Sequence, residues 1–206
     1  LRDILSRYLQ CEPNELNFSV NEYGKPGLSR SNDFSRSAKS ATEVATTQGV
    51  EFNLSHSGDF ALIAVTRGRK VGVDVELIRE GIELENLSSR NFSQMENQEL
   101  MALPVEQRTL GFFACWTRKE AYIKAQGLGL SLPLDSFDVS LGESAVLRAT
   151  RPDASESARW SLHSLNVESN YAAALAVEGN DFEIRCWDWS RCPPQIAGKE
   201  LRRSDK

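Results

Sequence analysis

The stretch from Phe112 to Leu134 constrains the fold of this chain more than any other part of the sequence. It reads FFACWTRKEAYIKAQGLGLSLPL, and its first part combines strong helix formers with apolar residues at intervals of three and four. Two glycines then suit the end of a helix, and an extended segment is expected after them. Glu120 and Lys124 share one face with aromatic residues. Charges on such a stripe are costly without partners, so the chain must supply charged groups beside it.

A strand pattern upstream supplies the candidate partner. Residues 71–76 read VGVDVE, and strict alternation with β-branched residues predicts a strand. Asp74 and Glu76 then share one face, where two carboxylates repel each other unless they meet water or a divalent cation. With Glu120 from the helix, three carboxylates can hold one Mg²⁺ and leave positions open for water and substrate phosphates. Asp74 taken alone reads as a strand-end residue that bonds to backbone amides, and only its partnership with Glu76 and Glu120 makes it a ligand candidate.

Composition and charge exclude several classes of protein. The chain has 206 residues and a formal net charge of −5, which argues against a general nucleic-acid-binding protein. No apolar run is long enough to span a membrane, and no signal-peptide pattern opens the chain. The four cysteines, at positions 11, 115, 186 and 192, form no paired metal-binding spacing, and reduced thiols are the simplest interpretation.

The region before the VGVDVE motif predicts a pair of strands. Residues 51–66 read as two strands around a turn at residues 55–58, and the nearly apolar run 60–65 predicts a buried central strand. His56 is then expected at a strand end, near the top of the sheet. Residues 161–177 weakly repeat this order of polar segment, turn and apolar strand, which fits two similar α/β halves with a site between them.

The remaining segments have plainer interpretations. Residues 80–108 are charged and helical, with a capping-box pattern that begins at Ser93. Residues 181–188 are expected to form a last strand. Residues 29–49 are a polar insertion to which no role is given, and residues 191–206 form a charged tail.

Taken together, these motifs resemble the signature of the larger, Sfp-type 4′-phosphopantetheinyl transferases. The family pattern joins (V/I)-G-(V/I)-D to (F/W)-(S/C/T)-x-K-E-(A/S)-x-x-K through a long spacer, and both blocks match here, at residues 71–74 and 116–124. Further blocks match in order: NEYGKP at 21–26, FNLSHSG at 52–58 and GLSLPLDSF at 129–137. The matched blocks cover most of residues 21–141.

The resemblance implies an α+β fold of two similar α/β halves related by a pseudo-twofold axis, with the active site in the cleft between them. We expect an amino-terminal half at residues 1–78, a carboxyl-terminal half at residues 79–190 and the tail at 191–206. Residues 1–10 are amphipathic and begin without a cap, so the first half is expected to be truncated at its start. In relatives, that segment carries basic residues that help to hold coenzyme A.

The resemblance also implies a reaction of the holo-[acyl-carrier-protein] synthase type. Phosphopantetheine would move from coenzyme A to a serine of an acyl- or peptidyl-carrier protein, with release of 3′,5′-ADP and a requirement for Mg²⁺. The enzyme is expected to be a cytoplasmic monomer, with an organelle left open and with no nucleic-acid or membrane partner. No short motif identifies the carrier. The alternatives are another Mg²⁺-dependent phosphate enzyme and a non-catalytic protein that binds coenzyme A or a carrier.

For single residues, the resemblance implies three overlapping sets. The metal ligands are Asp74, Glu76 and Glu120, and the catalytic residues are Glu120 and Lys124. The general base is either Glu120 or an intervening water or hydroxide. The residues expected to bind coenzyme A are Lys25, Ser55, His56, Asp74, Lys119, Glu120 and Lys124. Without the resemblance, Lys25 reads as a solvated loop lysine and His56 as a hydrogen-bonded surface residue. For Lys119, a solvated helix lysine is an equal alternative.

Overall fold

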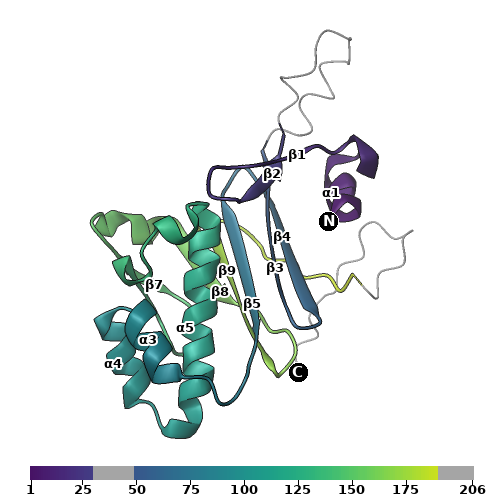
Figure 1. Ribbon diagram of the computed structural model, residues 1–206. Coiled ribbons are helices and arrows are strands. Elements are labelled where there is room, and N and C mark those ends of the chain that lie inside the picture. The colour runs from purple at the N-terminus through teal and green to yellow at the C-terminus, as the bar shows by residue number, and fades with distance from the viewer. Residues whose placement is uncertain (30–48, 190–206) are drawn as a thin grey trace.

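The computed structural model describes residues 1–29 and 49–189 and shows an α+β fold (Figure 1). The predicted insertion and the charged tail therefore fall almost entirely outside the described residues. The helices are α1 (Arg2–Leu9), α3 (Leu84–Asn91), α4 (Gln94–Ala102) and α5 (Val105–Gln126). The strands are β1 (Phe18–Val20), β2 (Pro26–Leu28), β3 (Val50–Ser57), β4 (Phe60–Arg67), β5 (Val71–Leu77), β6 (Phe137–Val139), β7 (Leu147–Thr150), β8 (Trp160–Ser164) and β9 (Tyr171–Glu178). None of the described helices has the length and apolar character needed to cross a membrane.

The central sheet is antiparallel and has the order β5–β9–β8, and α5 lies along it (Figure 1). β3 and β4 form a separate hairpin beside β5, while β1 pairs with β2 and β6 with β7. β5 pairs with β9 over its whole length, from Val71 opposite Val177 to Leu77 opposite Tyr171. The expected boundary at residues 78/79 thus separates two strands that are direct neighbours in one sheet.

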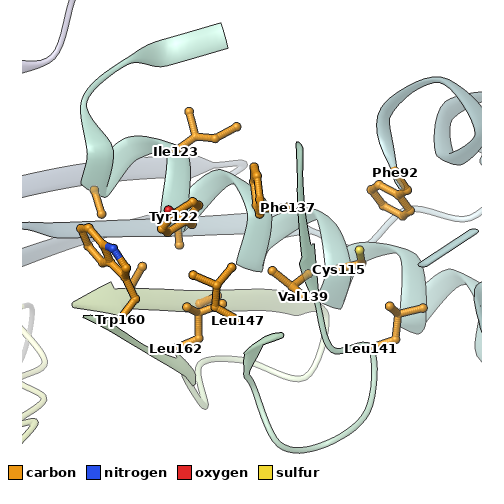
Figure 2. Packing of buried hydrophobic residues seen from close by; sticks show 14 of the residues in the cluster. Phe92, Cys115, Tyr122, Ile123, Phe137, Val139, Leu141, Leu147, Trp160 and Leu162 are labelled. Carbon is orange, nitrogen blue, oxygen red and sulfur yellow. The ribbon is translucent and has the colours of Figure 1, made fainter. Parts of the chain in front are cut away.

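The main core lies between α5, the central sheet and the β6–β7 hairpin (Figure 2). Aromatic rings dominate it: the Tyr122 ring meets that of Phe137 at 4.8 Å between centroids and that of Trp160 at 5.3 Å. These contacts bury large apolar areas, and this burial is the main force that holds α5 against the sheet. Cys115, expected to be a buried apolar residue, is completely buried in this core.

A glycine sets the distance between α5 and β5. A Cβ atom at Gly72 would stand 2.0 Å from the carbonyl oxygen of Ala121 and 2.3 Å from the amide nitrogen of Ala125. Any side chain there would force the helix away, so Gly72 lets the two backbones touch. The helix then ends at Gly127, whose left-handed φ of 71° gives the expected C-terminal cap.

Two predictions for the β3–β4 region need correction. The hairpin turn is Gly58–Asp59 and not residues 55–58, because the ladder continues until Ser57 pairs with Phe60. β4 is half-buried and, in the described part of the chain, pairs with β3 alone, so it is not a buried central strand. Its apolar run is explained by cores on both sides: Leu62 packs on the valines of β5, and Val65 packs on the core beneath α1.

Two other segments also differ from expectation. Residues 181–188 form no strand; Arg69 donates to the carbonyl of Asp181, and side-chain contacts replace a ladder. The segment after α5, expected to be extended, contains two short 3-10 turns, and the carbonyl of Pro133 accepts the amide of Ser136 at 3.0 Å. By contrast, the capping box that begins at Ser93 is confirmed, with Ser93 and Glu96 each accepting the other's backbone amide.

Candidate active site

β5 and α5 bring one carboxylate and one ammonium into direct contact. The Lys124 Nζ atom lies 2.6 Å from Asp74 Oδ1, and the side chain of Asp74 is only 3% exposed, against 28% for Lys124. Gly72 lies two residues before Asp74 on the same face of β5. It permits this approach because it lets α5 pack directly on the strand. The prediction that the VGVDVE strand supplies a charged partner for Lys124 is therefore confirmed by this contact.

Asp74 has one bonded oxygen and one free oxygen. Its Oδ1 accepts hydrogen bonds from Ser55 Oγ at 2.8 Å and from Lys124, whereas the buried Oδ2 has no partner among the described residues. Burial raises the pKa of this carboxyl, and the nearby Lys124 and the Ser55 hydroxyl oppose that increase. An unpaired buried carboxylate oxygen is costly, so a cation beside Oδ2 would relieve it.

The charges of Glu76 and Glu120 interact with that of Asp74. Burial raises the pKa of the Glu120 carboxyl, the charge of Asp74 raises it further, Lys124 opposes the shift, and Glu76 contributes a smaller increase. Three carboxylates that influence each other in this way would all be stabilised by one divalent cation.

The expected metal site requires the side chains of Asp74, Glu76 and Glu120 to lie close together. Among residues 1–29 and 49–189, no group of three or more His, Cys, Asp or Glu side chains stands close enough to hold a metal ion. Glu76 and Glu120 are both partly exposed. The donors are hard carboxylate oxygens, one of them unpaired, and this set suits Mg²⁺.

Lys25 lies next to this junction, on the turn between β1 and β2. Its ammonium donates to the carbonyls of Val71 and Ala125, each at 3.2 Å, and is therefore half-buried and not a solvated loop lysine. Burial lowers the pKa of Lys25. Asn21 Nδ2 donates to the Gly127 carbonyl at 2.7 Å and holds the same turn on the end of α5. A cavity of about 310 Å³ opens beside Lys25.

His56 and Ser55 point to opposite sides of β3, as neighbours on a strand must. Ser55 is buried against Asp74, whereas His56 is exposed on the other side. The hydroxyl of Ser55 has one proton, and the structure directs it to Asp74, so the expected role of this hydroxyl as a donor to coenzyme A is replaced by a role in holding Asp74.

The expected role of Lys119 in binding coenzyme A is wrong for this structure. Its side chain is 0% exposed, and its ammonium bonds to Glu96 and to the carbonyls of Leu134 and Phe137, at 2.7–2.8 Å. Its charge is thus fully compensated within the fold, and it is neither a ligand of a substrate nor a solvated helix lysine.

Sequence reasoning missed two polar residues of β3. Asn53 and Ser57 face β5 together with Ser55, and Ser57 Oγ donates to Glu76 Oε2 at 2.9 Å. The signal was present in the spacing: polar residues at 53, 55 and 57 have the same period of two as Gly72, Asp74 and Glu76. It was overlooked because residues 55–58 were interpreted as a turn.

Comparison with known proteins identifies the family. The sequence-family model of the 4′-phosphopantetheinyl transferase superfamily matches residues 70–176. The 4′-phosphopantetheinyl transferase HetI of a Nostoc species is 37% identical over 92% of this chain and 72% of its own length. The 4′-phosphopantetheinyl transferase Sfp of Bacillus subtilis is 32% identical over 88% of this chain and 72% of its own length. The chain therefore belongs to the 4′-phosphopantetheinyl transferase superfamily, and it is an enzyme of that class.

Solved structures add a weaker similarity. The holo-[acyl-carrier-protein] synthase of Thermotoga maritima matches 53% of this chain and 62% of its own, with 21% identity and a TM-score of 0.41. Among the curated relatives, HetI and Sfp are transferases, and none of the comparisons supports a protein that binds coenzyme A or a carrier without turnover.

Proposed function

We propose that the junction of β3, β5 and α5 transfers phosphopantetheine from coenzyme A to a serine of an acyl- or peptidyl-carrier protein, and that the reaction requires Mg²⁺. The contact between Lys124 and Asp74, with Glu76 and Glu120 beside it, is the observation that carries this proposal. In this proposal, fixed positive charge and the carboxylates that would hold the metal lie together there, as transfer of a phosphate group requires.

The transfer is a displacement at phosphorus. The serine oxygen forms a bond to the β-phosphorus of coenzyme A, the bond from that phosphorus to 3′,5′-ADP breaks, and the leaving group takes the electron pair. Asp74, Glu76 and Glu120 would hold Mg²⁺, which when bound neutralises the pyrophosphate charge as it shifts to the leaving group. Lys124, partly exposed beside Asp74, adds fixed positive charge on the same side.

Glu120 is proposed to take the proton of the attacking serine. Its carboxyl is half-buried and interacts with the charges of Asp74 and Lys124, so it is a proton acceptor at the proposed phosphate site. Lys25, which borders the cavity at the end of α5, is proposed to contact the nucleotide end of coenzyme A. His56, which is exposed, is proposed to contact a phosphate of coenzyme A. The two-lobed arrangement with a pseudo-twofold axis and the monomeric state are part of the same proposal.

The test is to mix the protein with coenzyme A, Mg²⁺ and apo carrier proteins and to weigh the carriers by mass spectrometry. We expect a gain of one phosphopantetheine group that is lost with EDTA and in Glu120→Gln. The matched control is Glu106→Gln, an exposed glutamate in the first turn of the same helix, which should retain activity. Full transfer in EDTA, or by Glu120→Gln, would contradict the proposed metal site.

A further inference from the structure

β3 and β5 lie side by side without pairing through their backbones. In the described part of the chain, β3 pairs with β4 and β5 pairs with β9, in separate sheets. Three side chains of β3 nevertheless accept hydrogen bonds from alternate amides of β5: Asn53 from Val73 at 2.9 Å, Ser55 from Val75 at 3.3 Å and Ser57 from Leu77 at 3.0 Å. The offset is 20 residues at each step, so the two strands run parallel and in fixed register.

Asn53, Ser55 and Ser57 form an array along β3, and the chemistry of its partners fixes the direction of the serine hydroxyl protons. A backbone N–H can only donate, so the oxygens of Ser55 and Ser57 must accept from β5. Their own protons are then free for an acceptor, and each meets a carboxylate: Ser55 Oγ lies 2.8 Å from Asp74 Oδ1, and Ser57 Oγ lies 2.9 Å from Glu76 Oε2. Each serine thus holds one oxygen of one carboxylate.

The third member of the array lacks this second function. Asn53 accepts the amide of Val73 in the same way, but the neighbouring position on that face of β5 is Gly72, which has no side chain to hold. Asn53 is also buried. It therefore reports what the hydrogen bonds between the strands contribute to folding alone, and it is a natural control for the serines.

We propose that Ser57 is a positioning residue for the transfer reaction: its hydroxyl holds Glu76 Oε2 so that the other carboxylate oxygen is presented to a divalent cation. Ser55 does the same for Asp74, whose second oxygen is the unpaired buried atom. Outer hydrogen bonds of this kind orient metal ligands and typically change metal affinity by about 10–100-fold. This inference rests on the proposed function, because it takes Glu76 as a metal ligand.

Three variants separate positioning from folding. Ser57→Ala removes the donor, Ser57→Thr keeps a hydroxyl, and Asn53→Ala removes a bond between the strands that touches no carboxylate. The measurements are binding of Mn²⁺, followed by electron paramagnetic resonance without substrates, and the Mg²⁺ concentration that gives half the maximal rate. The urea midpoint of unfolding reports the structural effect of each change.

For Ser57→Ala, we expect Mn²⁺ binding to weaken about 10-fold, near the lower end of the range for outer hydrogen bonds, with a matching rise in the Mg²⁺ requirement. The KM for the carrier should stay unchanged, and Ser57→Thr should restore both metal properties. Asn53→Ala should lower the urea midpoint and leave Mn²⁺ binding within about twofold of the unchanged protein, since it is outside the metal shell. If Ser57→Ala unfolds the protein, Ser57→Cys, which keeps the shape and weakens the donor, takes its place.

The outcomes distinguish this inference from the function on which it rests. If Ser57→Ala and Asn53→Ala weaken Mn²⁺ binding equally, or neither weakens it while Glu76→Gln abolishes it, Ser57 is only structural and the inference is wrong. If Glu76→Gln leaves Mn²⁺ binding and transfer intact, the proposed metal ligand itself is wrong. Loss of metal binding in Ser57→Ala with recovery in Ser57→Thr supports the inference.

Discussion

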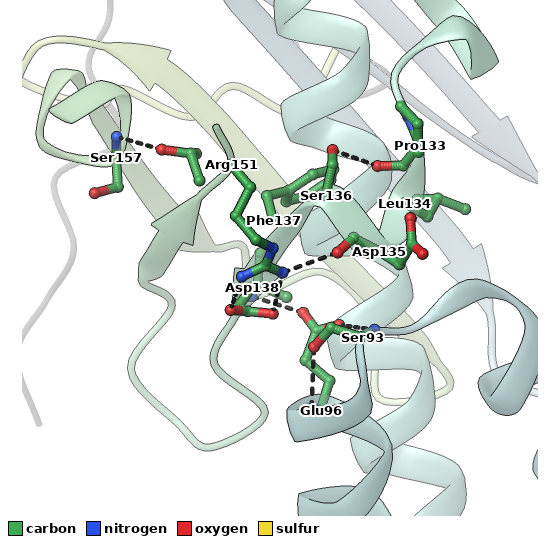
Figure 3. A network of polar contacts seen from close by, with 12 residues as sticks. Ser93, Glu96, Pro133, Leu134, Asp135, Ser136, Phe137, Asp138, Arg151 and Ser157 are labelled. Carbon is green, nitrogen blue, oxygen red and sulfur yellow. Dashed lines mark hydrogen bonds and ion pairs between the residues drawn. The ribbon is translucent and has the colours of Figure 1, made fainter. Parts of the chain in front are cut away.

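The Lys119 ammonium and the Glu96 carboxylate form an ion pair at 2.8 Å in which both side chains are completely buried. Lys119 also holds the carbonyls of Leu134 and Phe137, and Glu96 accepts the amides of Ser93 and Val139. Figure 3 shows Glu96 at the start of α4, facing the segment that leads into β6. The pair therefore ties α4, α5 and β6 together, on the side of α5 that does not carry Lys124.

The first prediction concerns this pair. Lys119→Met leaves the Glu96 charge buried and unpaired, so we expect the free energy of unfolding to fall by about 3–5 kcal/mol. Lys70→Met, at an exposed lysine, should change it by less than about 0.5 kcal/mol. Urea unfolding measures both. The double variant Lys119→Met with Glu96→Gln should be more stable than Lys119→Met alone, because the uncompensated charge is gone. A stable Lys119→Met variant with weakened coenzyme A binding would return Lys119 to the ligand set.

Gly72 gives the second prediction. In Gly72→Ala, the new methyl group overlaps the backbone of α5, so the helix must move away from β5. Overpacking of this kind costs about 1–3 kcal/mol, and it also separates Lys124 from Asp74. We expect lower thermal stability and at least a tenfold loss of transfer activity, since catalytic geometry tolerates only small displacements. Gly27→Ala, where no atom lies within 4 Å of the added Cβ, is the control for stability. Unchanged activity in Gly72→Ala would show that the close approach is not required.

The third prediction concerns Lys25. If its ammonium binds coenzyme A as proposed, Lys25→Met removes a charge-assisted hydrogen bond, and the KM for coenzyme A should rise about 10-fold or more with a smaller change in kcat. Steady-state kinetics with an apo carrier measures this split. Arg90→Met, at an exposed arginine of α3, should leave KM unchanged. If kcat instead fell while the KM for coenzyme A stayed unchanged, Lys25 would act by holding the β1–β2 turn against α5.

The sequence predicted much of this fold because local patterns and global contacts agree in the VGVDVE strand and in α5. Alternation identified Asp74 and Glu76 as neighbours on one face, and helical spacing placed Glu120 and Lys124 together. Lys119 was misplaced because periodicity describes a helix face but not the partner packed on it, and a buried glutamate of another helix supplies that partner.

The array along β3 was missed for a related reason. The polar alternation at residues 53–57 was visible, but its meaning depends on a parallel neighbour 20 residues away that pairs through side chains. Local propensity cannot distinguish such a strand from a turn. In the same way, residues 181–188 alternate as a strand does, yet they form no strand in the structure.

The last prediction follows from the bond between Arg151 and Asp138 shown in Figure 3. The guanidinium donates to Asp138 Oδ2 at 2.7 Å and to Oδ1 at 2.9 Å, and these bonds lower the pKa of that carboxyl. A depressed folded-state pKa stabilises the fold above the unfolded pKa of about 3.9, and the contribution is lost as the pH falls through the lower folded value.

Arg151→Gln should therefore reduce the free energy of unfolding at pH 7 by about 1 kcal/mol, the low end for a charged hydrogen bond because Arg151 is half-exposed. The difference from the unchanged protein should shrink as the pH falls below about 4, where Asp138 becomes protonated in the unfolded chain and then in the folded one. Urea unfolding at pH 7, 5 and 3 measures this difference, and the effects of other carboxyls cancel in the comparison. Asp138→Asn should reduce the pH dependence in the same range, because it removes the titrating group. A difference for Arg151→Gln that grows toward pH 3 would reverse the predicted sign and show that the bidentate bond does not stabilise the ionised carboxylate.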